Sequence, residues 1–142
     1  MGYSFKKPEL LELALTHPSV NHEQKKTLTN NQRLEFLGDA VLQMIISAEL
    51  YRQFPAHDEG TLSKARARMV NREALAEQAA QIKLGGDLML SRGEERNGGR
   101  ERTSALADAF ESVVGAIYLD GGFIKVKKFI LIQFSERFEG AN

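Results

Sequence analysis

Residues 32–42 read QRLEFLGDAVL, and the apolar residues that begin here recur at steps of three and four up to Phe54. This spacing predicts a helix over residues 32–54. On a helical wheel one apolar group contains Leu37, Val41, Met44 and Ile45, and a second group on the other side contains Leu42, Ile46 and Leu50. A helix that is apolar on both sides is normally buried. We therefore expect this helix to be central, with the rest of the chain packed around it.

Two carboxylates lie on this helix, although both of its sides carry apolar residues and neither is a typical solvent face. Glu35 and Asp39 lie four residues apart, on the same side as the second apolar group. Like charges at this spacing repel each other. Leaving such carboxylates unpaired in an apolar environment costs several kcal/mol. We therefore expect a positively charged group to face them.

A second acid pair lies on the helix predicted over residues 103–119. Asp108 and Glu111 are three residues apart, and the bulky residues of this helix lie opposite them. The neighbours of Asp108 on its own face are all small: Ser104, Ala105, Ser112 and Gly115. Small side chains allow another helix or a ligand to approach closely. The two acid pairs can therefore meet at one site.

Four carboxylates without His or Cys form an oxygen-only ligand set, which suits Mg²⁺ or Mn²⁺ rather than zinc. Such a site typically activates water and stabilises the charge of a phosphoryl transition state. The spacing alone leaves a second interpretation open. Acids on helices are mostly solvated or paired with Lys and Arg, and these four could be so as well.

The remaining sequence predicts an all-α fold, because no segment alternates apolar and polar residues with a period of two. Further helices are predicted over residues 7–15, 61–69, 72–82 and 123–138, and loops over residues 18–31 and 91–102. Asp120-Gly121-Gly122 is expected to end the helix that starts at Thr103. Together these segments predict six or seven helices around one core.

Composition narrows the class of protein further. The length of 142 residues fits one domain, and 19 Lys plus Arg balance 19 Asp plus Glu. Cysteine is absent, which excludes disulfides and thiolate metal sites. No apolar run approaches the roughly 18–20 residues of a membrane helix, and the first residues carry charges where a secretory signal would be apolar. We therefore expect a soluble, cytoplasmic protein that does not associate with membranes.

Several motifs along the chain, in this order, resemble those of the ribonuclease III family. Besides residues 32–42 they are Ala14–Ser19 (ALTHPS), Asp58–Ser63 (DEGTLS), Gly93–Arg100 with its Gly-rich loop, Ala107–Glu111 (ADAFE) and Gly115–Gly122 (GAIYLDGG). The motifs cover about residues 10–123. The whole chain, residues 1–142, is accordingly identified as an endonuclease domain of this family.

The resemblance implies an all-helical, homodimeric endonuclease domain with a valley across the dimer and an active centre at each end. It implies hydrolysis of double-stranded RNA to 5′-phosphate and 3′-hydroxyl ends with staggered 3′ overhangs, as in rRNA and mRNA precursor processing. The catalytic and metal-site acids would be Glu35, Asp39, Asp108 and Glu111. Mg²⁺ would be the metal cofactor, with Mn²⁺ as a substitute, and no organic cofactor is implied.

The same resemblance assigns three further residues around the site. Phe36 would insert into a socket of the partner subunit, although the pattern alone leaves a core phenylalanine open. Gln32 stands where the family often has Glu, so a charged role there is lost, and Glu59 matches an acid near the valley. Thr103 stands where an acid is common in the family, and Pro18 stands where Arg is common. None of these departures removes a metal ligand.

Basic residues predict where RNA would lie, because double-stranded RNA is held mainly through phosphate and 2′-hydroxyl contacts. The candidates are Lys64, Arg66, Arg68 and Arg72 in one stretch, and Arg96 and Arg100 in the Gly-rich loop. A solvated charged face is the alternative for each of them. The net charge of zero is then the sum of an acid cluster and basic stretches.

Two other functions remain open at this stage. One is a catalytically silent, nuclease-like dimer that binds RNA or ribosomal particles, and the other is a helical interaction module without nucleic acid. Retention of all four acids favours the nuclease. No double-stranded-RNA-binding domain is recognisable in this chain, although bacterial family members usually carry one after the nuclease domain. We expect an excised domain rather than a short enzyme of the Mini-ribonuclease III type.

Overall fold

The computed structural model describes residues 1–24 and 29–141, and these residues form an all-α fold, as predicted. Within them no strand is present beyond an isolated bridge between Thr16 and Met89. The helices are α1 (Pro8–Ala14), α2 (Pro18–Gln24), α3 (Gln32–Gln53), α4 (Glu59–Val70), α5 (Arg72–Gln81), η1 (Leu84–Asp87), α6 (Arg92–Arg96), η2 (Gly99–Glu101), α7 (Thr103–Gln133) and α8 (Ser135–Gly140). None of them is long and apolar enough to cross a membrane.

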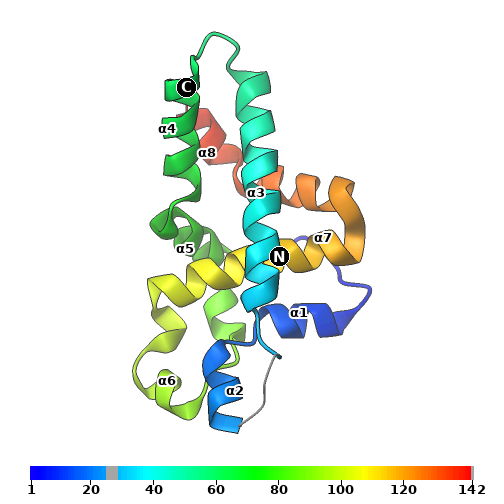
Figure 1. Cartoon of the computed structure of the whole chain (residues 1–142), viewed down its shortest axis with the longest axis vertical. Coiled ribbons are helices and arrows are strands. Elements are labelled where there is room, and N and C mark those ends of the chain that lie inside the picture. The colour runs from blue at the N-terminus through cyan, green and yellow to red at the C-terminus, as the bar shows by residue number, and fades with distance from the viewer. Residues whose placement is uncertain (25–28, 142) are drawn as a thin grey trace.

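Helices α3 and α7 cross at the centre of the molecule and pack more extensively than any other pair (Figure 1). Leu42, Ile46 and Leu50 of α3 are buried, which confirms the central helix. One part of the prediction is wrong, because the Met44 side chain is 54% exposed. The other helices cover α3 on the sides of Ile45 and Ile46, so the face that carries Phe36, Ala40 and Met44 is left at the surface.

Two glycines set the distance between α3 and α7. A Cβ atom at Gly38 would overlap the backbone carbonyl oxygen of Glu111, and one at Gly115 would overlap that of Leu34. No side chain therefore fits at either position. Because the backbones touch here, residues one turn away on both helices are forced together, which places the two acid pairs beside each other.

Helices α4 and α5 begin at side-chain caps. The Asp58 carboxylate accepts from the Thr61 N–H at 2.8 Å, and the Asn71 amide oxygen accepts from the Ala74 N–H at 2.8 Å. Such caps satisfy donors that the first helical turn leaves free. The predicted break at residues 120–122 is a kink inside α7, where Gly122 has a φ of 85°. The predicted helix over residues 123–138 is interrupted at Phe134, between α7 and α8.

Both predicted loops contain helices, so these two predictions are wrong for the residues described. The prediction over residues 18–31 covers α2, where Pro18 occupies the first turn and His17 Nδ1 accepts from the Ser19 N–H at 3.1 Å. Residues 25–28 of that predicted loop lie outside the described part. The prediction over residues 91–102 covers α6 and η2, because Ser91 caps α6 by accepting from the Glu94 N–H at 3.1 Å.

The N-terminal segment is fastened to α7 by one carboxylate. Asp120 accepts hydrogen bonds from the Tyr3 hydroxyl at 2.7 Å, the Lys6 N–H at 2.8 Å and the Lys7 N–H at 3.0 Å. Helix α1 begins directly after these residues and packs against α7. Asp120 thereby fixes where α1 lies on the central crossing.

Candidate active site

The acids singled out in the sequence converge where α3 and α7 cross. Glu35 of α3 and Asp108 and Glu111 of α7 each place one carboxylate oxygen within 4.8 Å of the others, and all three residues are half-buried. Asp39, one turn further along α3, is exposed and lies outside this group of three. Its side chain forms a hydrogen bond with Glu111. The group of three, with Asp39 beside it, is the acid cluster.

Burial and mutual repulsion make this cluster hard to ionise. Burial raises the pKa of Glu111 to about 9, and a hydrogen bond to Asp39 and the charges of Asp39, Glu35 and Asp108 act in the same direction. Burial likewise raises the pKa of Glu35 to about 7, together with the charge of Asp108 and a hydrogen bond to it. Groups with strongly raised pKa values in such a setting are frequent at functional sites.

A cation lies beside the cluster, as the sequence predicted, but at a distance. Arg72 Nη1 is 3.9 Å from Asp108 Oδ1, and the two side chains are 57% and 35% exposed. The Arg72 charge also lowers the pKa of Glu35, against the larger effect of burial. A solvent-exposed pair of this length contributes little free energy. Arg72 therefore does not neutralise the cluster.

The donor set of the cluster fits a hard divalent cation. It offers carboxylate oxygens from three residues that are already gathered, and magnesium and manganese prefer such oxygen ligands. Glu35, Asp108 and Glu111 are placed to hold the ion, and Asp39 is placed to contact Glu111 or to join them. A bound divalent cation would also relieve the repulsion that raises the pKa values of Glu35 and Glu111.

Ser112 is a residue of the site that the sequence did not assign. Its buried hydroxyl oxygen lies 3.0 Å from the Asn31 carbonyl oxygen and 2.8 Å from the Asp108 carbonyl oxygen. The contact joins α7 to the residue that precedes α3, so the two acid pairs are kept in register. The sequence marked Ser112 only as a small neighbour of Asp108, and nothing in it indicates this bond.

Comparisons with known proteins identify the family. The family model described as ribonuclease-III-like matches residues 7–137. The chain therefore belongs to the ribonuclease-III-like family. Ribonuclease 3 of Oleidesulfovibrio alaskensis is 48% identical over 135 residues, which are 95% of this chain and 59% of that protein. Ribonuclease 3 of Syntrophomonas wolfei is 54% identical over 128 residues, which are 90% of this chain and 54% of that protein.

A solved structure supports the same family. The nuclease domain of ribonuclease III from Campylobacter jejuni superposes with a TM-score of 0.89 at 43% identity, covering 96% of this chain and 92% of that one. The recognised family and the all-α fold are thus confirmed. The chain spans between one half and two thirds of the length of the curated ribonuclease 3 proteins described above.

Phe36 lies on the surface of this ribonuclease-III-like domain. Its side chain is 71% exposed, which excludes the alternative of a core phenylalanine. It lines a largely apolar pocket of about 710 Å³ together with Leu10, Leu13, Leu37 and Leu119. Gln32 is exposed and lines the same pocket, and its role near the site stays a prediction. The socket role of Phe36 stays a prediction.

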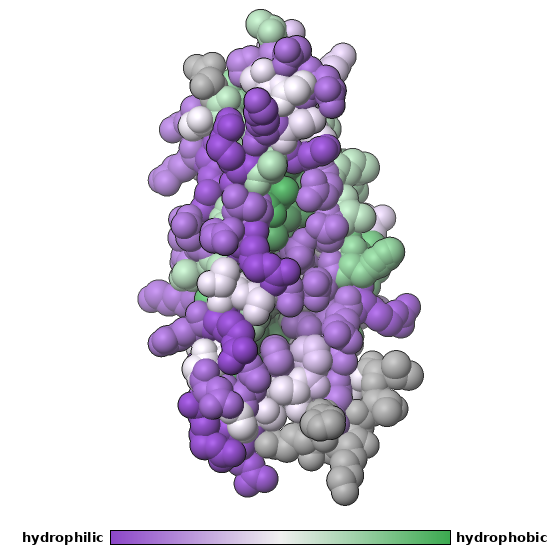
Figure 2. All heavy atoms as spheres, turned by 60° about the vertical axis from the view of Figure 1, so that its left-hand side comes forward, coloured by the Kyte–Doolittle hydropathy of each residue, from purple (hydrophilic) through white to green (hydrophobic). Residues whose placement is uncertain are grey.

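The basic residues of α4 lie on a face that is mainly hydrophilic. Figure 2 brings the side of α4 and α6 forward. Hydrophilic side chains cover most of it, and apolar side chains show in a hollow along its middle and at its right-hand edge. Lys64 and Arg68 are exposed, whereas Arg66 donates to the Ser47 hydroxyl at 2.9 Å. Glu59 is exposed at the start of α4 and accepts from the Ser63 hydroxyl at 3.3 Å. Their roles toward RNA stay predictions.

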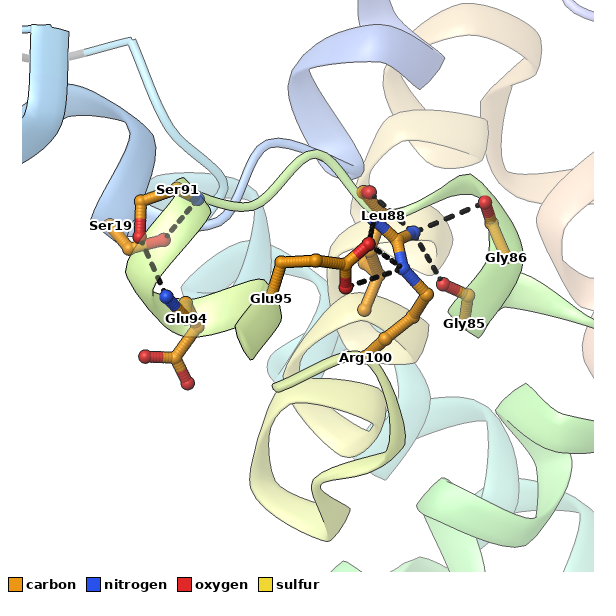
Figure 3. Close-up of polar contacts among 8 residues, drawn as sticks. All are labelled: Ser19, Gly85, Gly86, Leu88, Ser91, Glu94, Glu95 and Arg100. Atoms are coloured by element: carbon orange, nitrogen blue, oxygen red, sulfur yellow. Dashed lines mark hydrogen bonds and ion pairs between the residues drawn. The ribbon is translucent and has the colours of Figure 1, made fainter. Parts of the chain in front are cut away.

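In the Gly-rich loop, Arg96 is exposed, but Arg100 is engaged inside the chain. Its Nε donates to both Glu95 carboxylate oxygens, at 3.0 and 2.9 Å. Its Nη1 donates to the carbonyl oxygens of Gly85 at 2.9 Å, Gly86 at 3.2 Å and Leu88 at 2.8 Å (Figure 3). Arg100 therefore ties α6 and η2 to η1, and its contact with RNA stays a prediction.

Proposed function

We propose that residues 1–142 form the endonuclease domain of a metal-dependent ribonuclease that hydrolyses phosphodiester bonds in double-stranded RNA. The products would carry 5′-phosphate and 3′-hydroxyl ends with staggered 3′ overhangs. The observation that carries this proposal is the convergence of Glu35, Asp108 and Glu111 within 4.8 Å in a ribonuclease-III-like fold. A domain that only binds RNA gains nothing from such a repelling acid cluster.

The acids of the cluster would divide the work by position. Glu35, Asp108 and Glu111 would hold a divalent cation, Mg²⁺ or in its place Mn²⁺, and Asp39, which lies beside Glu111, would complete the ligand set. When bound, the ion supplies activation of water and stabilisation of charge on the phosphate. Glu35 and Glu111 must release their protons before they bind a cation, so binding becomes tighter as the pH rises.

Substrate binding and assembly complete the proposal. Lys64, Arg66, Arg68 and Arg96 would contact RNA phosphates, and the domain would act as a homodimer. The Campylobacter jejuni nuclease domain is described as having a region involved in dimer formation. In this chain, Phe36 with its 71% exposure and the apolar pocket beside it would form that interface. Each protomer would then cut one strand of a precursor RNA.

Incubation of the protein with long double-stranded RNA, in Mg²⁺ or in EDTA, tests this function. We expect short duplex products in Mg²⁺ at low salt and intact RNA in EDTA. Single-stranded RNA of the same sequence should stay intact in both. If RNA is retained in a filter assay but never cut in Mg²⁺, the protein is an RNA-binding domain and the proposed hydrolysis is wrong.

Sedimentation tests the homodimer separately. We expect the protein to sediment as a dimer at micromolar concentration, and Phe36→Ala to shift it toward the monomer, because an exposed aromatic anchor typically dominates such an interface. Ile124→Ala removes an apolar side chain of α7 that is 82% exposed and should leave the dimer intact. A monomeric protein at this concentration would contradict the assigned role of Phe36.

A further inference from the structure

Arg72 is the basic residue of the α4–α5 region that reaches the acid cluster. It is the first residue of α5, directly after the Asn71 cap, and α5 packs along α7. This placement brings Arg72 Nη1 to 3.9 Å from Asp108 Oδ1, while 57% of its side chain stays exposed. Arg72 thus combines a contact with the cluster and freedom to move into solvent.

We propose that Arg72 is an exchangeable counter-ion of the acid cluster, which pairs with Asp108 in the metal-free protein and competes with the divalent cation for it. This inference rests on the proposed function, since it presumes that the cluster binds a divalent cation. It makes Arg72 a positioning residue: it acts on the ligand carboxylates and not on the reacting atoms.

The length of the Arg72–Asp108 pair supports exchange. Direct charge-assisted hydrogen bonds between a guanidinium and a carboxylate are about 2.7–2.9 Å long, and the Arg72 pair at 3.9 Å exceeds that range. By contrast, Arg137 Nη2 lies 2.6 Å from Glu77 Oε2, and Arg100 donates to Glu95 and three carbonyls. Among the residues that the structure describes, Arg72 has no such anchoring set of short bonds, so a stronger cation can displace it.

The charges at the cluster support competition. One guanidinium carries a single charge, whereas four carboxylates surround the site, so Arg72 leaves most of the repulsion in place. A positive charge a few ångströms from the ligand oxygens also repels an incoming divalent ion, by an amount that salt reduces. Removal of that charge should therefore tighten cation binding.

Direct measurement of Mn²⁺ binding, without RNA, tests this inference. Free Mn²⁺ would be followed by electron paramagnetic resonance at pH 7.5 and low salt, with the whole chain as wild type, Arg72→Ala and Arg72→Lys. We expect Arg72→Ala to lower the Kd for Mn²⁺ about threefold, an order of magnitude set by Coulomb repulsion at this range. Arg72→Lys should stay within about twofold of the wild type, because it keeps the charge.

A matched control removes one positive charge far from the site. Lys127→Ala changes an exposed residue beyond the Gly122 kink of α7 and should leave the Kd for Mn²⁺ unchanged. Thermal unfolding followed by circular dichroism confirms that each variant is folded. Loss of structure alone would weaken binding, so tighter binding in Arg72→Ala is specific to the counter-ion role.

The outcomes separate the two proposals. An unchanged or higher Kd in folded Arg72→Ala overturns the counter-ion role and leaves the proposed nuclease standing. Failure of the wild type itself to bind Mn²⁺ at millimolar concentration overturns both, because the acid cluster would then not be a metal site. A lower Kd that also appears in Lys127→Ala would reflect net charge only and overturns the role of Arg72.

Discussion

Two charged regions of the molecule are built in opposite ways. Around Arg100, hydrogen bonds to Glu95 and three backbone carbonyls satisfy the guanidinium, and the same bond lowers the pKa of Glu95. In the acid cluster, burial and crowding raise the pKa of Glu35 to about 7 and that of Glu111 to about 9. Charged groups that are hydrogen-bonded within the chain stabilise the fold, whereas carboxylates crowded together favour the binding of a cation.

The largest expected effect is on catalysis by the acid cluster. Glu111→Gln removes a charged ligand oxygen, and we expect RNA cleavage to fall by about 10³-fold, which corresponds to about 4 kcal/mol of transition-state stabilisation. Initial rates on long double-stranded RNA in Mg²⁺ measure this. Glu101→Gln in η2 removes an exposed acid outside the cluster and should cleave at the wild-type rate. Normal cleavage by Glu111→Gln would refute the assigned site.

The second prediction concerns the crossing that brings the acids together. Gly38→Ala places a methyl group against the Glu111 carbonyl oxygen, so α3 and α7 must move apart. We expect the free energy of unfolding to fall by about 3 kcal/mol, the upper range for overpacking. Urea unfolding measures it. Gly86→Ala adds the same methyl group where no atom lies within 4 Å and should change stability by less than about 0.5 kcal/mol.

Much of this architecture could be predicted from the sequence, and the misses have physical reasons. The apolar period of residues 32–54 is long enough to specify α3, and the acids on both helices could be read directly. A helical wheel assigns Met44 to the core, although it is exposed, because a wheel does not show which side of a helix its neighbours cover. Apolar spacing does not predict helices α2 and α6, because caps at His17 and Ser91 start them.

Contacts between residues that are distant in the sequence could not be predicted from it either. The close approach at Gly38 and Gly115 depends on how two helices cross, which neither helix specifies alone. Arg100 and Arg72 look alike in the sequence, as members of basic stretches. The structure separates them, since Arg100 is held by short bonds and Arg72 is not.

The third prediction concerns the hydrogen bonds around Arg100. Arg100→Ala leaves Glu95 and the carbonyls of Gly85 and Leu88 without their donor, and we expect about 2 kcal/mol lower stability. Arg96→Ala, at an exposed neighbouring position, should change it by less than about 0.5 kcal/mol. Urea unfolding of both variants measures the difference. Equal stability of the two variants would show that the Arg100 bonds contribute nothing net.

The smallest expected effect is a pH dependence of stability in the metal-free protein. In the folded state, Glu111 keeps its proton up to about pH 9, whereas its ordinary value is 4.5. Between these values the unfolded chain binds fewer protons, so the free energy of unfolding falls as the pH rises. Glu35 adds the same trend up to about pH 7. The melting temperature in EDTA should therefore decrease from pH 5 to pH 9.

Glu111→Gln isolates that contribution, because the amide cannot ionise. At pH 9 in EDTA, we expect the variant to melt roughly 3–5 °C above the wild type, a solvent-screened effect of about 1 kcal/mol. The difference should vanish below about pH 3.5, one unit under the ordinary value of 4.5, where Glu111 is mostly protonated in both states. Parallel melting curves at every pH would contradict the raised pKa of Glu111.

The Asp120 carboxylate links residues 3–7 to the pocket beside Phe36. Segments outside regular structure are usually prone to proteolysis, but Tyr3, Lys6 and Lys7 are bonded to Asp120. Helix α1, which follows them, supplies Leu10 and Leu13 to one wall of the pocket beside Phe36. Proteolytic removal of seven residues would therefore loosen that wall and weaken subunit association, while every acid of the cluster stayed in the chain.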